Sequence, residues 1–163
     1  MGKFNGYLKS TYQPPMQWVL SASLTYDCDD LTKGEIKALR DVGVKVTNSG
    51  KITVKKGFIT DMASVPRACW WLIAPFDVAR AAVIHDLLYK TIRQYRASGV
   101  KQDEDLVKAA KKASDNVFLY GMRDAQPAIP NWKIYQCFQA VKLFGASSIK
   151  PTPHDYPPTE ADK

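Results

Sequence analysis

Residues 78–95 read VARAAVIHDLLYKTIRQY, and their apolar side chains recur at the spacing of an amphipathic helix. Asp77 can cap the first turn of this predicted helix. The positions that share its apolar face are Val78, Ala82, His85, Tyr89 and Ile92. Sequence patterns differ on the two sides of this segment, so it marks the change from one kind of secondary structure to another.

The residues before this segment favour strands. Residues 18–26 alternate well enough for a half-buried strand, after a turn-rich stretch at residues 13–15. Residues 44–47 and 52–54 flank Asn-Ser-Gly-Lys, which predicts a hairpin, and residues 57–59 begin an extended segment that runs into Thr60 and Asp61. Between the strands, residues 31–42 predict a short helix, with Thr32 as its cap and Gly43 as its end.

The residues after this segment favour helices. Asp103, Glu104 and Asp105 place negative charge on the first turn of a helix that ends near Ser114 or continues to Met122. A final helix is capped by Asn131 and stopped by Gly145; its apolar positions are Ile134, Phe138, Val141 and Phe144. Strands followed by helices predict an α+β fold, in which N-terminal antiparallel strands and a hairpin pack against about three C-terminal helices. Residues 1–150 form this single domain, and residues 151–163 form a Pro-rich polar tail.

Composition indicates a basic globular protein. The chain has 163 residues, of which 45% are hydrophobic, enough for one domain with a core. Its net charge is +7, and since residues 151–163 contribute −2, residues 1–150 carry +9. No apolar run approaches the roughly 18 residues of a membrane span, and no secretion or myristoylation signal opens the chain. Cys28, Cys69 and Cys137 are far apart, which favours buried thiols in a reducing cytoplasm.

The residues best suited to chemistry cluster at the end of the predicted strands. Thr60, Asp61 and Ser64 are small polar residues at a strand end, and Arg67 follows with a charge that suits an anion or a carboxylate. His85 lies 18 positions beyond Arg67 among apolar neighbours. Catalytic roles are assigned here to Asp61, Ser64 and His85.

Two kinds of chemistry fit this cluster. His85 with Asp61, Asp86 and Asp105 offers a mixed nitrogen and oxygen ligand set for zinc, manganese or magnesium. Without a metal, His85 oriented by an aspartate can act as a general base that activates the Ser64 hydroxyl. Since neighbouring residues on a helix point about 100° apart, only one of His85 and Asp86 can face a given centre, and Asp86 lines up with Lys90 for an ion pair.

A purely structural interpretation accounts for the same residues. A histidine on an apolar helical face is most often a core residue hydrogen-bonded to a carboxylate, and Asp61 is the candidate partner for His85. Ser64 can cap a helical turn at Val65 and Pro66, with Asp61 in a turn. These alternatives remain open at the level of the sequence.

Other surface patterns are less specific. Nucleic-acid binding finds weak support in a group of cations near Tyr89 and Tyr95, namely Lys90, Arg93, Arg96, Lys101, Lys108, Lys111 and Lys112. Trp70, Trp71 and Phe76 favour a core or a protein interface over base stacking. His154 and Asp155 lie in the Pro-rich tail and are set aside as ligands. The chain also lacks the zinc-protease, serine-hydrolase and P-loop motifs.

Two blocks resemble a known family. Residues 57–67, GFITDMASVPR, and residues 81–89, AAVIHDLLY, are similar to the motifs of domain of unknown function 1353, a family of small tailed-bacteriophage and prophage proteins. Glu104 and Asp105 stand where that family has Ala-Asp, and residues 138–145 match its last helix. The resemblance covers roughly residues 44–145. It implies a compact α+β domain of phage origin and a shared site for Asp61, Ser64, His85, Asp86 and Asp105, without an established activity.

Two functions follow as hypotheses. The first is an accessory or virion-associated structural protein of a tailed phage that binds other virion proteins, made in the host cytoplasm and carried in the virion. The second is a small hydrolase, with a divalent metal such as zinc or magnesium as an optional cofactor, that attacks peptidoglycan or nucleic acid during entry or lysis. The position of His85 discriminates between them, since an open cleft shared with Asp61 favours the enzyme and a sealed interior position favours the binding protein.

Overall fold

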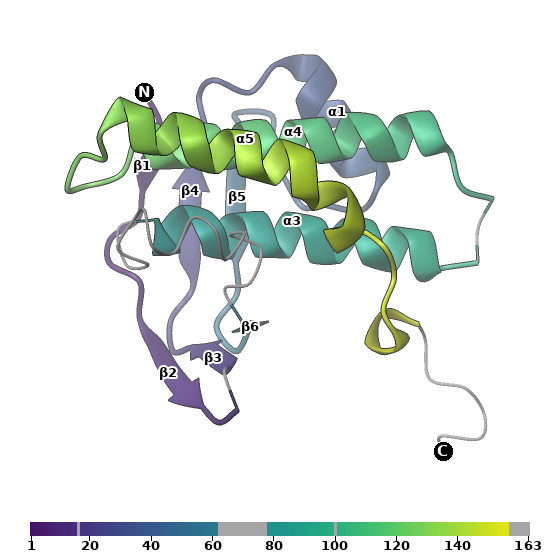
Figure 1. Ribbon diagram of the computed structural model, residues 1–163, viewed down its shortest axis with the longest axis horizontal. Helices are drawn as coiled ribbons and strands as arrows, with labels where there is room; N and C mark the ends of the chain where they lie inside the picture. The colour runs from purple at the N-terminus through teal and green to yellow at the C-terminus, as the bar shows by residue number, and fades with distance from the viewer. Residues whose placement is uncertain (16, 62–77, 100, 157–163) are drawn as a thin grey trace.

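The computed structural model describes residues 1–15, 17–61, 78–99 and 101–156. Within them, two small antiparallel sheets precede most of the helices, which confirms the α+β prediction (Figure 1). One sheet has the order β1 (Lys3–Phe4), β4 (Leu24–Asp27), β5 (Lys51–Val54), and the other β2 (Ser10–Gln13), β3 (Gln17–Leu20), β6 (Ile59–Thr60). Ser64, Arg67, Cys69, Trp70, Trp71, Phe76 and Asp77 lie outside the described residues.

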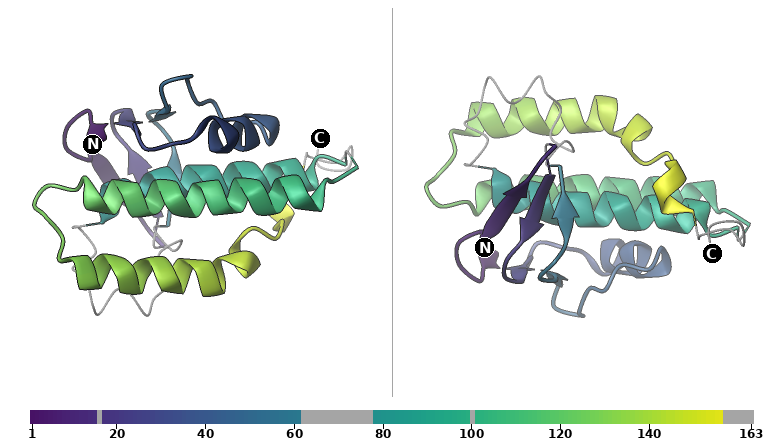
Figure 2. Two further views of the ribbon diagram at one scale, coloured as in Figure 1. Left: turned by 90° about the horizontal axis from the view of Figure 1, so that it is seen from above. Right: turned by 90° about the horizontal axis from the view of Figure 1, so that it is seen from below.

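The helices stack in three layers. α3 (Ala79–Ala97) and α4 (Glu104–Arg123) pair along their lengths at the centre, with α1 (Lys33–Asp41) on one side of α4 and α5 (Asn131–Ser148) on the other (Figure 2). The β1–β4–β5 sheet packs on α3. Its alternating strands direct Leu24, Tyr26, Ile52 and Val54 into the core, as a sheet with one covered face requires.

Local sequence signals explain where two of the helices begin. Thr32 Oγ1 accepts from the Glu35 backbone N–H, and the Glu35 carboxylate accepts from Thr32 N–H, so the predicted cap of α1 is confirmed as a capping box. Asp103 caps α4 by accepting from the backbone N–H groups of Asp105 and Leu106 at 3.0 and 3.1 Å. α4 runs past Ser114 to Arg123, which agrees with the longer of the two predicted ends.

Three predictions of local structure differ from the structure. The strand expected over residues 18–26 is two strands in different sheets, β3 and β4, because the chain leaves one sheet after Leu20 and enters the other at Leu24. The hairpin expected at residues 44–54 is reduced to a single antiparallel bridge between Val46 and Ile52, on the edge of β5 that does not pair with β4. Asn131 is the first residue of α5, which Pro130 precedes as its cap.

The predicted end of α5 at Gly145 is also wrong. The helix continues to Ser148, and Gly145 is buried where α5 crosses α3 and α4. A Cβ atom at this position would lie 2.2 Å from Tyr89 Oη and 3.2 Å from Lys111 Nζ. This glycine therefore serves close packing between helices rather than helix termination.

Candidate functional site

The end of β6 is tied to α3 through a buried polar contact. Thr60, which pairs with Trp18 across the sheet, donates a hydrogen bond from Oγ1 to the Asp86 carboxylate. Both residues are buried. This contact fixes the strand end against the helix, so Asp61, the next residue, lies close to Asp86.

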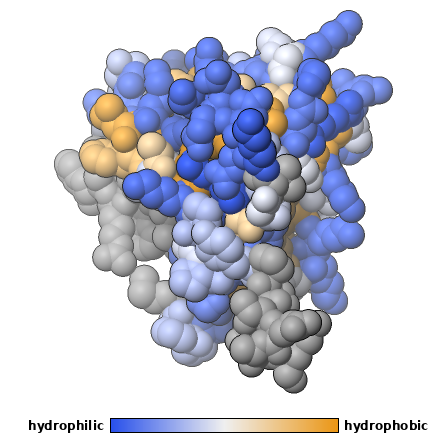
Figure 3. Space-filling view, turned by 90° about the vertical axis from the view of Figure 1, so that its right-hand side faces the viewer, coloured by the Kyte–Doolittle hydropathy of each residue, from blue (hydrophilic) through white to orange (hydrophobic). Residues whose placement is uncertain are grey.

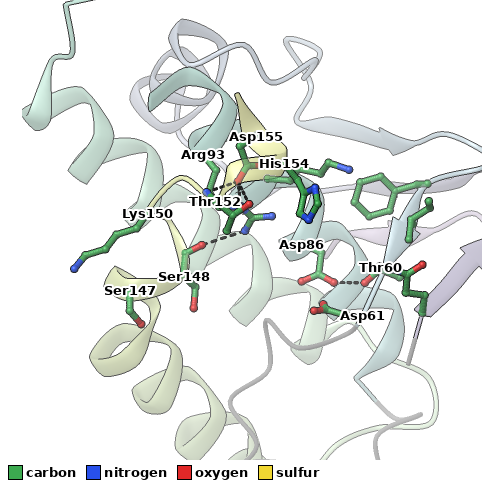
Figure 4. A pocket seen from close by; sticks show the side chains of 14 residues that line it. Thr60, Asp61, Asp86, Arg93, Ser147, Ser148, Lys150, Thr152, His154 and Asp155 are labelled. Atoms are coloured by element: carbon green, nitrogen blue, oxygen red, sulfur yellow. Dashed lines mark hydrogen bonds and ion pairs between the residues drawn. The ribbon is translucent and has the colours of Figure 1, made fainter. Parts of the chain in front are cut away.

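Asp61 and Asp86 line a pocket of about 470 Å³ between β6, α3 and the C-terminal segment (Figure 4). We call it the β6–α3 pocket. It is bounded by three carboxylates, four basic side chains and several hydroxyls. The lining residues are Gln17, Phe58, Ile59, Thr60, Asp61, Asp86, Lys90, Arg93, Ser147, Ser148, Lys150, Thr152, His154 and Asp155. Such a mixture suits a polar or charged ligand rather than an apolar one.

The C-terminal segment closes one side of this pocket. Residues 153–155 form a short 3-10 helix, η1, that packs on α3. Asp155 accepts from Arg93 Nε at 3.2 Å and from the Thr152 hydroxyl and backbone N–H at 2.7 and 2.8 Å. Arg93 also donates to the Ser148 carbonyl. Burial by itself would raise the pKa of Asp155, but the Thr152 hydrogen bonds and the Arg93 charge outweigh it and hold that pKa below its ordinary value.

We expect Arg93→Gln to release residues 152–156 while leaving the rest of the domain folded, because Arg93 is the side chain that joins Asp155 to α3. Amide hydrogen exchange over these residues should rise by up to about fivefold, which corresponds to about 1 kcal/mol, and global stability should fall by no more than the same amount. Arg96→Gln is the matched control, since Arg96 pairs with the exposed Glu104 away from the segment. Equal exchange in both variants would contradict the role given to Arg93.

His85 points away from the β6–α3 pocket. It is 0% exposed, and its Nε2 atom lies 3.4 Å from Asp115 Oδ1 on α4, with Tyr89 and Phe118 rings against the imidazole. Since a carboxylate only accepts, Nε2 carries the proton. Nδ1 is then the unprotonated nitrogen, and it has no hydrogen-bond partner among the described residues. His85 and Asp86 therefore face different parts of the molecule, as their angular separation on a helix requires.

Asp115 is the centre of a buried polar cluster. Its carboxylate accepts from the Tyr89 hydroxyl at 2.7 Å and pairs with Lys111 Nζ at 2.8 Å, in addition to His85. Burial alone would raise the pKa of Asp115, but His85, Lys111 and Tyr89 together hold it below its ordinary value. Burial lowers the pKa of His85 more than the neighbouring carboxylate raises it. The cluster therefore holds a neutral imidazole beside an ionised carboxylate.

This arrangement predicts an acid-sensitive component of stability. The His85 pKa is lower in the folded chain than in the unfolded chain, so below about pH 6.5 the unfolded state binds more protons. Stability contributed by neutral His85 is complete above that pH and falls by up to about 1.4 kcal/mol per pH unit until the folded pKa is reached. We expect His85→Gln to reduce the loss of unfolding free energy between pH 7 and pH 5. Parallel urea denaturation curves for the two proteins check this, and identical pH dependence would contradict it.

The structure brings together some of the sequence-predicted site residues and separates others. Asp61 and Asp86 share the β6–α3 pocket, whereas His85 contacts Asp115 rather than Asp61. Asp105 lies on the first turn of α4, where its side chain is 94% exposed and pairs with Lys108. Among the described residues no group of three or more His, Cys, Asp or Glu side chains is placed to hold a metal ion.

The basic group near the α3–α4 turn is largely paired with acids. Arg93 pairs with Asp155, Arg96 with Glu104, Lys108 with Asp105, and Lys111 with Asp115. Figure 3 shows this end of the molecule, whose visible described surface is mainly hydrophilic. Much of the positive charge that suggested a phosphate-binding patch is thus balanced locally, which weakens the case for nucleic-acid binding. In the described part of the chain no helix is both long and apolar enough to cross a membrane.

Sequence reasoning missed the residues that complete both sites. Asp115 and Lys111 are spaced as an ordinary i, i+4 pair on a helix, and nothing in that spacing indicates that His85 and Tyr89 of another helix meet them. For His154 and Asp155 the sequence predicts no ligand role, because a Pro-rich stretch lacks a core of its own. The useful signal was Thr152 three positions before Asp155, a capping pattern that organises the short turn on α3.

Comparison with known proteins identifies the family to which the chain belongs. The family model described as Protein of unknown function (DUF1353) matches residues 37–141, more than half of the chain. The chain therefore belongs to this family, and the resemblance drawn from its motifs is confirmed. No curated protein and no solved structure matches it.

Proposed function

We propose that the chain is an accessory or virion-associated structural protein of a tailed bacteriophage and acts through protein–protein contacts. The observation that carries the proposal is the exposure of large apolar side chains on α5, together with the sealed position of His85. Trp132, Tyr135, Leu143 and Phe144 are 57%, 60%, 73% and 61% exposed, while His85 is 0% exposed. Apolar side chains gathered on one element are typical of an interaction surface.

Particle composition tests this proposal. Gradient-purified particles of the phage that encodes the chain should contain it at a copy number reproducible between preparations, measured by quantitative mass spectrometry. A host protein of similar abundance serves as the control for carry-over. Absence of the chain from particles, with the protein present in the infected cell, would overturn a virion-associated role.

A small hydrolase acting on an anionic polymer is the second candidate. One feature favours it: the β6–α3 pocket places Lys90, Arg93 and Lys150 beside Asp61 and Asp86. Cations can hold an anionic substrate, and carboxylates can move protons. Asp61 and Asp86 are also the pocket residues that would bind a divalent metal in such an enzyme.

Activity assays separate the two candidates. Purified chain should be incubated with peptidoglycan and with nucleic acid, each with and without zinc, magnesium or manganese, and compared with Asp61→Asn, His85→Gln and the exposed-site control Asp105→Asn. We expect no turnover by any of the four proteins. Turnover that Asp61→Asn or His85→Gln abolishes while each variant stays folded would establish the hydrolase instead.

A further inference from the structure

We infer that the outward face of α5 is the docking surface for an acidic amphipathic helix of another protein, an inference that rests on the proposed function. The α5 face is defined here as Trp132, Tyr135, Gln139 and Leu143. Its members are three or four residues apart, so they form one line along about three turns of the helix. Ile134, Cys137, Val141 and Gly145 occupy the opposite, buried side.

A groove beside this face gives it shape. Leu119 of α4 and Ile134, Tyr135 and Phe138 of α5 form the apolar walls of a depression of about 540 Å³ between the two helices. Arg123, Asn131 and Gln139 supply its polar rim. An apolar groove beside a helix, bordered by polar groups, is the kind of surface into which an amphipathic helix inserts its apolar side chains.

On α5 and along the groove lining, as far as the structure describes them, the charged side chains are of one sign. α5 contains Lys133 and Lys142 and no acidic residue, and Arg123 is the charged residue lining the groove. The two lysines are held near the aromatic side chains, with Lys133 Nζ 5.7 Å from the centre of the Trp132 ring and Lys142 Nζ 5.4 Å from that of Phe138. A partner helix that covers this face therefore needs carboxylates beside the apolar side chains that it inserts, because these carboxylates complement the cations.

A second copy of the chain fits this surface poorly. Pairing α5 with α5 about a twofold axis would bring Lys133 and Lys142 of both copies into one interface without any acid from either helix. Like charges in an interface oppose association. An acidic helix from a different protein satisfies both the apolar groove and the cations.

Site-specific photocrosslinking in particle-producing cells tests the inference. A photoreactive phenylalanine analogue replaces Tyr135, and the control carries it at Tyr7, which is 89% exposed on a different part of the chain. Mass spectrometry of purified particles and of the whole cells should identify, at position 135 alone, a peptide of another protein with an amphipathic helical pattern and excess acid. Adducts with this chain itself, with lipid, with a neutral or basic peptide, or with nothing would each overturn the docking assignment.

The affinity of the chain for a synthetic peptide of the crosslinked sequence is then measured. Trp132→Ala and Leu143→Ala should each weaken binding at least about tenfold. Lys142→Glu should weaken it several-fold and reduce its salt dependence, with recovery when a peptide glutamate is changed to lysine. Tyr7→Ala should leave binding unchanged, and an equal loss in all four variants would contradict the surface. A chain present in particles without a Tyr135 adduct refutes this surface alone, whereas a chain absent from particles refutes the proposed function.

Discussion

Asp115→Ala should destabilise the domain by about 3–5 kcal/mol, the range found when one partner of a buried ion pair is removed. The carboxylate is 5% exposed and accepts from three side chains, His85, Tyr89 and Lys111. Removing it leaves a lysine ammonium with little solvent and a buried tyrosine hydroxyl without its acceptor. A loss of this size is a large fraction of the stability of most single domains.

Asp115→Asn separates charge from hydrogen bonding in the same place. The amide oxygen can still accept from Tyr89, so we expect the asparagine variant to lose less unfolding free energy than the alanine variant. Asp105→Ala is the control on the same helix, because Asp105 is exposed and its removal should change stability by less than about 0.5 kcal/mol. Urea denaturation monitored by circular dichroism gives all three values. Equal stability of Asp115→Ala and Asp105→Ala would show that the cluster does not hold the helices together.

Local patterns in the sequence predicted part of the fold. Apolar periodicity in residues 78–95 predicted α3, the cap at Thr32 marked the start of α1, and the acidic residues 103–105 marked the beginning of α4, because these signals depend on residues close together in the chain. The shift of the chain between sheets at residues 21–23 was missed, since both strands carry suitable side chains and only distant partners distinguish them.

The contacts of the candidate site were likewise predicted only in part. The motif residues Thr60, Asp61 and Asp86 do meet, and the angular argument that His85 and Asp86 cannot face one centre agrees with their positions. The partner of His85 could not be read from the sequence because Asp115 lies 30 positions away on another helix. Which carboxylate reaches a buried histidine depends on how α3 and α4 pack, and the sequence offered Asp61 as the candidate partner instead.

Gly145→Ala should destabilise the domain by about 1–3 kcal/mol, although alanine is the better helix former by about 1 kcal/mol. The added methyl group would lie 2.2 Å from Tyr89 Oη, far inside van der Waals contact, and 3.2 Å from Lys111 Cε and Nζ. Tyr89 is held by its ring contact with His85 and its hydrogen bond to Asp115, so it can yield little. The clash thus outweighs the gain in helix propensity.

A matched glycine isolates this effect. Gly34 in α1 has only Thr32 Oγ1 near its Cβ position, at 4.0 Å, so Gly34→Ala should be neutral or stabilise by up to about 1 kcal/mol. Tyr89→Phe removes the hydroxyl that the Gly145→Ala methyl group meets, at the expense of one buried hydrogen bond. In a double-mutant cycle measured by thermal and urea unfolding, Gly145→Ala should therefore cost less in the Tyr89→Phe background than in the parent. Equal costs in both backgrounds would show that α5 does not need glycine for its approach to Tyr89.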